Sequence, residues 1–255
     1  MIGRVYQMAS LTLRQVIRQR LFVNVAIFGL FMIVAAVVIS NITFGVGARV
    51  VRSIGLSGVT VALDLMAILL AVGIVHADID RKTLFVLFTR PLTRVEYIVG
   101  RFFGLSVALL AVLLGFGVIL ALSMNLSRTS FTGLDAVVLS MSYVEALILT
   151  AFGLVLSSFT TPTVGAGIGL GFWVAISSTD DLVGLASAGE SIDPTLATAL
   201  ATILPNLSKL DFREFAVRQL EIAPTAPLLA AGYGLLWVLA FLAIASVVLS
   251  RREMV

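Results

Sequence analysis

Cysteine is absent from the 255 residues, and histidine occurs once, as His76. Disulfides, thiol catalysis and zinc sites built from cysteine and histidine are therefore excluded. The sequence also lacks the G-x-x-x-x-G-K-[ST] pattern, whose glycine-rich loop binds nucleotide phosphates. We predict that the chain carries no catalytic residue, no cofactor site and no metal site of its own.

Charge is scarce as well. Charged residues make up 12% of the sequence and hydrophobic residues 60%, whereas about a quarter of a soluble domain is charged. A chain of this length cannot bury so much apolar surface in one water-soluble core. The net charge of +3 comes mostly from arginines near the ends of apolar stretches, which is typical of membrane orientation and not of nucleic-acid binding. The sequence therefore predicts an integral membrane protein in a lipid bilayer, with no nucleic-acid partner.

Six apolar stretches are candidates for crossing the roughly 30 Å of hydrocarbon in a bilayer. They are residues 21–40, 57–75, 102–124, 134–159, 164–178 and 227–250. Between the fourth and fifth, Pro162 predicts a tight turn, because proline ends one helix and starts the next. The predicted fold class is an all-α membrane protein with one six-span domain over residues 21–255.

The sequence also predicts a structure for each segment outside the spans. Residues 1–20 predict a basic amphipathic helix in the membrane interface, although they could also be the first turns of a longer first span. Residues 41–56 predict an outer loop or a short surface helix. Residues 179–226 predict an extracytoplasmic lid, gate or docking segment, with an amphipathic helix over 208–221.

The distribution of lysine and arginine predicts the orientation. An even number of spans places both termini on one side, together with residues 76–101. That side carries eleven of these residues, and the other side six. Short cytoplasmic loops are enriched in lysine and arginine, so both termini and residues 76–101 are expected in the cytoplasm.

Residues 76–101 form a charged island between the second and third spans. Pro91 divides the island into two pieces, and Leu84, Leu87 and Phe88 share one face of the first. Composition alone leaves two interpretations open: an element lying passively on lipid headgroups, or a docking element for a soluble partner.

The island also carries a recognisable series of residues. It reads Asp78-Ile-Asp80-Arg81-Lys82-Thr83-Leu84, then Arg90-Pro91-Leu92-Thr93-Arg94, then Tyr97 and Gly100-Arg101-Phe102-Phe103-Gly104. This series resembles the cytoplasmic loop of type-2 permeases of ATP-binding-cassette (ABC) transporters, with Asp for the usual Glu and Arg101 for the usual Lys. The basic N-terminal helix, the six-span layout, Leu204-Pro205-Asn206-Leu207 and the Arg-Arg tail extend the resemblance over nearly the whole chain.

The resemblance implies a mechanism and its partners. The island would be a coupling helix that sits in a cleft of the ATPase subunit. Asp78, Asp80, Arg81 and Thr83 would contact the ATPase or cap the helix, while Arg90 and Arg94 would hold the loop at the ATPase or lipid surface. Pro91 belongs to the same set of coupling residues. Two ATPase subunits would bind the ATP and Mg, and a second permease copy, identical or related, would complete the transporter.

Two charged residues lie inside predicted spans, Asp64 and Glu145. Charged groups there usually face a bundle interior or a cavity. The favoured interpretation is a residue near an interface that is bonded to a neighbouring helix, and a proton relay or a substrate contact is the alternative. Glycines in the fifth span form two interlocked G-x-x-x-G pairs, which predict a face for close helix approach. They are Gly165, Gly167, Gly169 and Gly171.

A protease interpretation is also considered, since Gly55-Leu-Ser57-Gly58 resembles the serine motif of intramembrane proteases of the rhomboid type. The one possible base, His76, lies 19 residues further along the same predicted helix. At 1.5 Å per residue this is about 28 Å, too far for a catalytic pair. A helix N-cap and a tight turn explain the motif instead.

The predicted function is a permease subunit that exports a substrate across the bacterial cytoplasmic (inner) membrane with energy from a separate ATPase. Two alternatives stay open. One is an ABC complex that does mechanical work on an extracytoplasmic accessory protein held by residues 179–226. The other is a secondary transporter with Asp64 and Glu145 as proton carriers.

Overall fold

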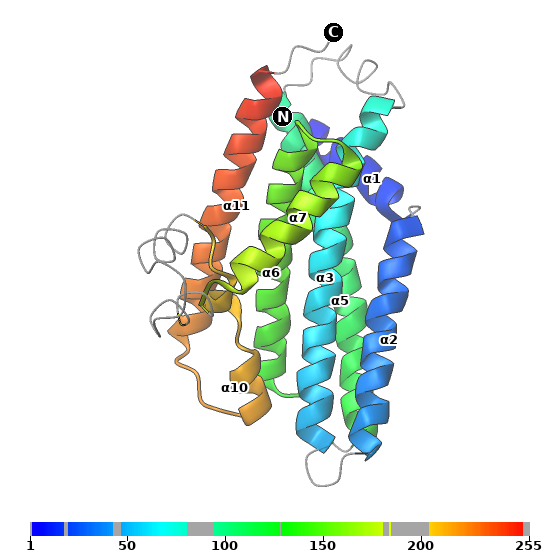
Figure 1. Ribbon diagram of the computed structural model, residues 1–255, viewed down its shortest axis with the longest axis vertical. Helices are drawn as coiled ribbons and strands as arrows, with labels where there is room; N and C mark the ends of the chain where they lie inside the picture. The colour runs from blue at the N-terminus through cyan, green and yellow to red at the C-terminus, as the bar shows by residue number, and fades with distance from the viewer. Residues whose placement is uncertain are drawn as a thin grey trace.

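The computed structural model describes residues 2–17, 20–42, 47–80, 94–127, 129–180, 184 and 204–251. All regular elements in this part of the chain are helices, and the longest run side by side as a bundle (Figure 1). The predicted all-α fold is confirmed.

Four helices contain stretches long and apolar enough to cross a membrane. They are α3 (Gly47–Asp80), α5 (Arg94–Leu126), α6 (Gly133–Ser157) and α11 (Thr225–Arg251). Two further helices are apolar but have shorter qualifying stretches, α2 (Arg20–Ile42) and α7 (Pro162–Ser177). At 1.5 Å per residue, the 16 residues of α7 reach about 24 Å, less than a full hydrocarbon core. The chain is thus a multi-pass membrane protein, and the number of six spans stays a prediction.

Helix α3 is the centre of the bundle, since it packs against α2, α5, α6 and α7. Its buried Leu63 and Leu70 belong to one apolar core with Leu109 of α5 and Ile148 of α6. Large apolar side chains on the outer faces of α2, α5 and α11 are exposed instead. Such faces suit hydrocarbon as a solvent, because lipid tails are as apolar as the side chains themselves.

The first turns of α3 differ from the expectation for residues 41–56. Residues 47–56 belong to the same continuous helix as the second span, so the expected outer loop or separate surface helix is corrected there. The physical reason is Arg52, which is 6% exposed. Its Nε donates to Asp135 Oδ1 at 2.9 Å and its Nη2 to the Ser130 carbonyl at 2.8 Å. The carboxylate of α6 neutralises the arginine and lets the helix run through it.

Several helix ends lie together at one end of the bundle (Figure 1). The C-terminal ends of α3 and α11 and the start of α5 lie at the end of the bundle that carries α1 (Ile2–Ile17). Helix α6 also ends there, and α7 begins with Pro162 as its first residue, which confirms the predicted turn. From there α7 crosses α6 and α3 at an angle (Figure 1).

Candidate functional site

Asp64 of α3 and Glu145 of α6 line the same cavity, whose volume is about 120 Å³. Both side chains are buried, and both lie near the middle of their apolar stretches, Arg49–Ile74 and Gly133–Ser157. The expectation that they sit near an interface therefore does not describe their place along the helices. The other residues that line the cavity are Thr60, Val61, Trp173, Ser177, Leu207, Ser208, Asp211 and Arg213.

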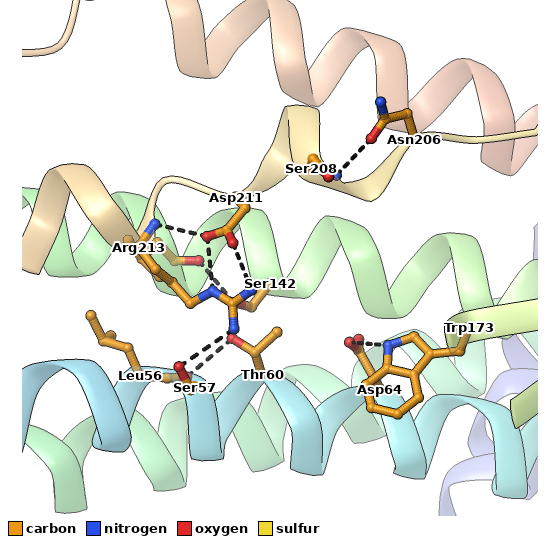
Figure 2. A network of polar contacts seen from close by, with 11 residues as sticks. Leu56, Ser57, Thr60, Asp64, Ser142, Trp173, Asn206, Ser208, Asp211 and Arg213 are labelled. Carbon is orange, nitrogen blue, oxygen red and sulfur yellow. Dashed lines mark hydrogen bonds and ion pairs between the residues drawn. The ribbon is translucent and has the colours of Figure 1, made fainter. Parts of the chain in front are cut away.

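Asp64 is held by a neighbouring helix, as predicted. Its Oδ2 accepts a hydrogen bond of 2.9 Å from the indole Nε1 of Trp173 on α7 (Figure 2). The side chain is 2% exposed, and its Oδ1 is buried without a hydrogen-bond partner among the described residues. An unpaired carboxylate oxygen in a protein interior is costly, so this atom is a position where a ligand could supply the missing partner.

Arg213 reaches the cavity from the segment between α7 and α11. Its Nε and Nη2 donate to Asp211 Oδ1 and Oδ2 at 2.8 and 2.6 Å (Figure 2). Its Nη1 lies 3.4 Å from Ser57 Oγ on α3. The hydrogen bond with Asp211 raises the pKa of Arg213 above its ordinary value, although burial opposes this. The guanidinium is therefore a fixed positive charge that is already matched by one carboxylate.

Asp211 is the carboxylate that fixes this arginine. Burial alone would raise the pKa of Asp211, but the side-chain and backbone hydrogen bonds from Arg213 outweigh it and hold the pKa below its ordinary value. The backbone N–H of Arg213 also donates to Asp211 Oδ1 at 2.9 Å. The two residues form one charge-neutral unit.

The segment that carries them is anchored by Asn206, from the predicted Leu-Pro-Asn-Leu motif. Its Nδ2 donates to Asp180 Oδ1 at 2.6 Å, and its backbone N–H donates to the Tyr233 hydroxyl of α11 at 2.9 Å. Its Oδ1 accepts from the backbone N–H of Ser208 at 2.9 Å and caps the 3₁₀ helix η1 (Leu207–Leu210). These bonds tie the cavity wall to Asp180, just after α7, and to α11.

The single amphipathic helix expected over residues 208–221 is wrong. The structure has η1 and then α10 (Arg213–Arg218), which are separated at Asp211 and Phe212. Asp211 has an extended backbone and bonds to the following Arg213 N–H, so the helix restarts there. Gln219, with a φ of 54°, ends α10 in the left-handed region.

A second polar contact, away from the cavity, lies near the start of α5. The buried Arg101 donates from Nη1 to Thr12 Oγ1 at 3.0 Å and to Gln15 Oε1 at 2.7 Å, both on α1. One turn further on, a Cβ added at Gly104 would lie 2.4 Å from the Thr12 Cβ and 2.7 Å from the Ala9 carbonyl oxygen. The Gly-Arg-Phe-Phe-Gly run thus provides the docking site of α1 on α5. Sequence reasoning had placed Arg101 in the charged island and had not paired it with α1.

Comparison with protein families decides the identity. The model of the ABC-2 family of transporter proteins matches residues 6–254. The chain belongs to the ABC-2 family. Comparison with curated proteins found no match. The resemblance read from the charged island is confirmed, and membership makes this chain a membrane transport subunit of the ABC type. Permeases of this family in general associate with an ABC ATPase and dimerise.

Three of the seven coupling residues expected for an ABC-2 permease lie in described helices, at one end of the bundle (Figure 1). Asp78 and Asp80 belong to the last turns of α3, and Arg94 is the first residue of α5. The other four, Arg81, Thr83, Arg90 and Pro91, lie outside the described residues.

The two glycine pairs of α7 are not equivalent. A Cβ at Gly165 would lie 2.7 Å from Val72 Cγ1, and one at Gly169 would lie 2.6 Å from Ile68 Cγ2, both on α3. At Gly167 and Gly171 an added Cβ meets nothing within 4 Å. The first pair therefore forms the predicted close approach, while the second makes no such contact within the described structure.

Proposed function

We propose that the chain is the permease subunit of an ABC exporter of the cytoplasmic (inner) membrane, driven by a separate ATPase. In this proposal two copies of the ATPase bind ATP and Mg, and two permeases, identical or related, form the substrate path. The chain crosses the membrane six times, with both termini in the cytoplasm. The family match over residues 6–254 supports the permease role, and the distribution of lysine and arginine along the sequence supports the orientation.

The observation that carries the proposal is the grouping at one end of the bundle. The last turn of α3, the first turn of α5 and the anchored helix α1 lie together there (Figure 1). Residues 76–101 include the last turn of α3 and the first turns of α5, so closure of the ATPases against them would act on the ends of two long helices at once. Because α3 is continuous from Gly47 to Asp80, a displacement at one end is carried as a rigid body to the other.

The Arg101 contact gives α1 a part in this mechanism. Thr12 and Gln15 of α1 hold Arg101 of α5, so α1 would resist independent movement of α5. A tilt of α3 relative to α5 would then open or close the path between the two permeases. Export follows if ATP-driven closure favours the state that is open to the outside.

The experiment is transport and ATP hydrolysis in proteoliposomes that contain the chain and the ATPase that co-purifies with it. We expect the ATPase rate to depend on the chain and the dependence to be lost on Asp78→Asn/Asp80→Asn. Glu214→Gln is the matched control, since Glu214 is an exposed carboxylate on α10 that pairs with Arg218. Solute movement by the purified chain alone on a proton gradient would contradict the proposal and favour the secondary transporter. A partner bound to residues 179–226 without solute flux would favour the mechanical role.

A further inference from the structure

The charges that line the cavity do not balance. Three carboxyl groups face it, those of Asp64, Glu145 and Asp211, with one positively charged group, that of Arg213. Asp211 and Arg213 neutralise each other through two side-chain hydrogen bonds. Arg213 also attracts Glu145 and Asp64 electrostatically, but its single charge cannot balance three carboxylates among the residues that line the cavity. Two buried carboxylates in one small space repel each other unless one of them takes up a proton or a positive charge joins them.

The open oxygen of Asp64 points to a ligand as well. Trp173 occupies Oδ2 and fixes the orientation of the carboxylate (Figure 2), while Oδ1 is buried without a partner in the described part of the chain. Neutral oxygens are available from the hydroxyl groups of Ser177 and Ser208, which line the same cavity. The Trp173 ring adds an aromatic surface of the kind that attracts cations. These groups together are the surroundings of a bound cation.

Size and charge limit what this cation is. A cavity of about 120 Å³ holds about four waters at roughly 30 Å³ each, and drug-sized ligands need roughly 300 Å³ or more. Although three carboxyl groups line the cavity, no group of three or more acidic or histidine side chains in the described part of the chain is arranged to hold a metal ion together. Arg213 also disfavours a second positive charge by repulsion. A divalent ion and an organic molecule of drug size are therefore both poor matches.

We propose that the cavity between α3, α6 and α7 is a binding site for one monovalent cation, held by the carboxylates of Asp64 and Glu145. The shared chemistry is a single positive charge on a small group, which is either a free alkali ion or a primary ammonium group. The site goes beyond the proposed ABC function, because binding requires neither the ATPase nor ATP. Failure of the proposed export function would leave it standing.

Tryptophan fluorescence of the purified full chain in nanodiscs tests the site. The chain has two tryptophans, so Trp237→Phe leaves Trp173, beside Asp64, as the reporter. Sodium, potassium and methylammonium chloride are titrated separately at pH 8, with N-methylglucamine chloride holding the ionic strength constant. We expect a saturable change in emission with at least one of these cations and none with N-methylglucamine, which is too large for the cavity. The alkali and methylammonium arms distinguish a free ion from an ammonium group.

Two near-isosteric variants and one control complete the test. Asp64→Asn and Glu145→Gln are expected to weaken binding by at least about tenfold, since each removes a charge worth on the order of 1.4 kcal/mol or more in a buried site. Glu214→Gln is expected to bind as the parent does, because Glu214 is exposed on α10. If a variant does not fold, competition between sodium and methylammonium for the parent protein is measured instead. Displacement of one cation by the other supports a single shared site, and the absence of competition contradicts it.

Three results would overturn the proposal. The first is a parent protein that shows no saturable response to any of the three cations, or the same response to N-methylglucamine. The second is a response to pH alone, which would make the cavity a proton site. The third is unchanged affinity in both carboxylate variants.

Discussion

Arg52 on α3 and Asp135 on α6 form a buried ion pair with 2.9 Å between Nε and Oδ1. The two residues are far apart in sequence, and each lies in the first turns of one of the long helices. Asp135 Oδ2 also accepts from the Thr132 backbone N–H at 2.8 Å, which completes a capping box at the start of α6. The Asp135 carboxylate thus caps α6, its own helix, and neutralises Arg52 of the neighbouring α3.

Replacing one partner of this pair should destabilise the protein strongly. We expect Arg52→Ala to reduce the free energy of unfolding by roughly 3–5 kcal/mol, because Asp135 would stay buried without its cation. The measurement is denaturant unfolding of the purified chain in detergent. Arg218→Ala is the control, since its pair with Glu214 is exposed and worth at most about 0.5 kcal/mol. Equal effects of the two substitutions would contradict the assignment.

The contact between α1 and α5 is tested at two glycines of α5. Gly104→Ala would place a methyl group against Thr12 and the Ala9 backbone, and such overpacking costs about 1–3 kcal/mol. Gly115→Ala meets nothing within 4 Å and should be neutral or stabilising by up to about 1 kcal/mol. Thermal unfolding of both variants measures the difference. A stable Gly104→Ala with α1 still protected from protease would count against the close approach.

The glycines of α7 provide a similar comparison within one helix. Gly169→Val should loosen the packing of α7 on α3, because even a Cβ there lies 2.6 Å from Ile68 Cγ2. Gly171→Val should have little effect on the monomer, since nothing lies within 4 Å. The expected result is a lower unfolding midpoint for the first variant alone. The reverse order would show that the two glycine pairs had been assigned to the wrong faces.

Asp211 makes stability depend on acid pH. Its pKa is lower in the folded chain than the ordinary value of 3.8, so its contribution is complete above that value and is lost as the pH falls through the lower, folded pKa. We expect the parent to be more stable than Asp211→Asn by a constant amount between pH 5 and about pH 8, and the difference to shrink below about pH 4. Unfolding midpoints of both proteins across this range give the result. A difference that grows on acidification would contradict the ion pair with Arg213.

The apolar stretches alone predict most of the helices, because a hydrocarbon solvent demands long apolar helices wherever the chain crosses it. The structure nevertheless starts α3 at Gly47, ahead of the predicted residue 57. Arg52 misled the prediction, since an arginine normally marks the end of a span. Its partner Asp135 lies 83 residues away in sequence, and local patterns do not contain that pairing.

The same limit applies to the cavity. Asp64 and Glu145 could be singled out because charged residues inside spans are rare. Their neighbours Trp173 and Arg213 could not, because they come from elements whose packing is not encoded in any periodicity. The break at Asp211 within residues 208–221 could not be predicted for a related reason. Glycine and proline are the usual signals of a helix break, and here the break comes from Asp211, which bonds the backbone of the following turn.

The most direct test of the central claim uses the absence of cysteine from the sequence. Lys82→Cys introduces a single thiol in the charged island, and Arg49→Cys introduces one near the start of α3, at the other end of the bundle. A short thiol-reactive crosslinker is applied to membranes that contain the complete transporter. The account predicts a crosslink from position 82 to a nucleotide-hydrolysing protein, dependent on ATP, and none from position 49. A position 82 that joins no such protein, or that reacts with a membrane-impermeant reagent from outside the cell, would contradict it.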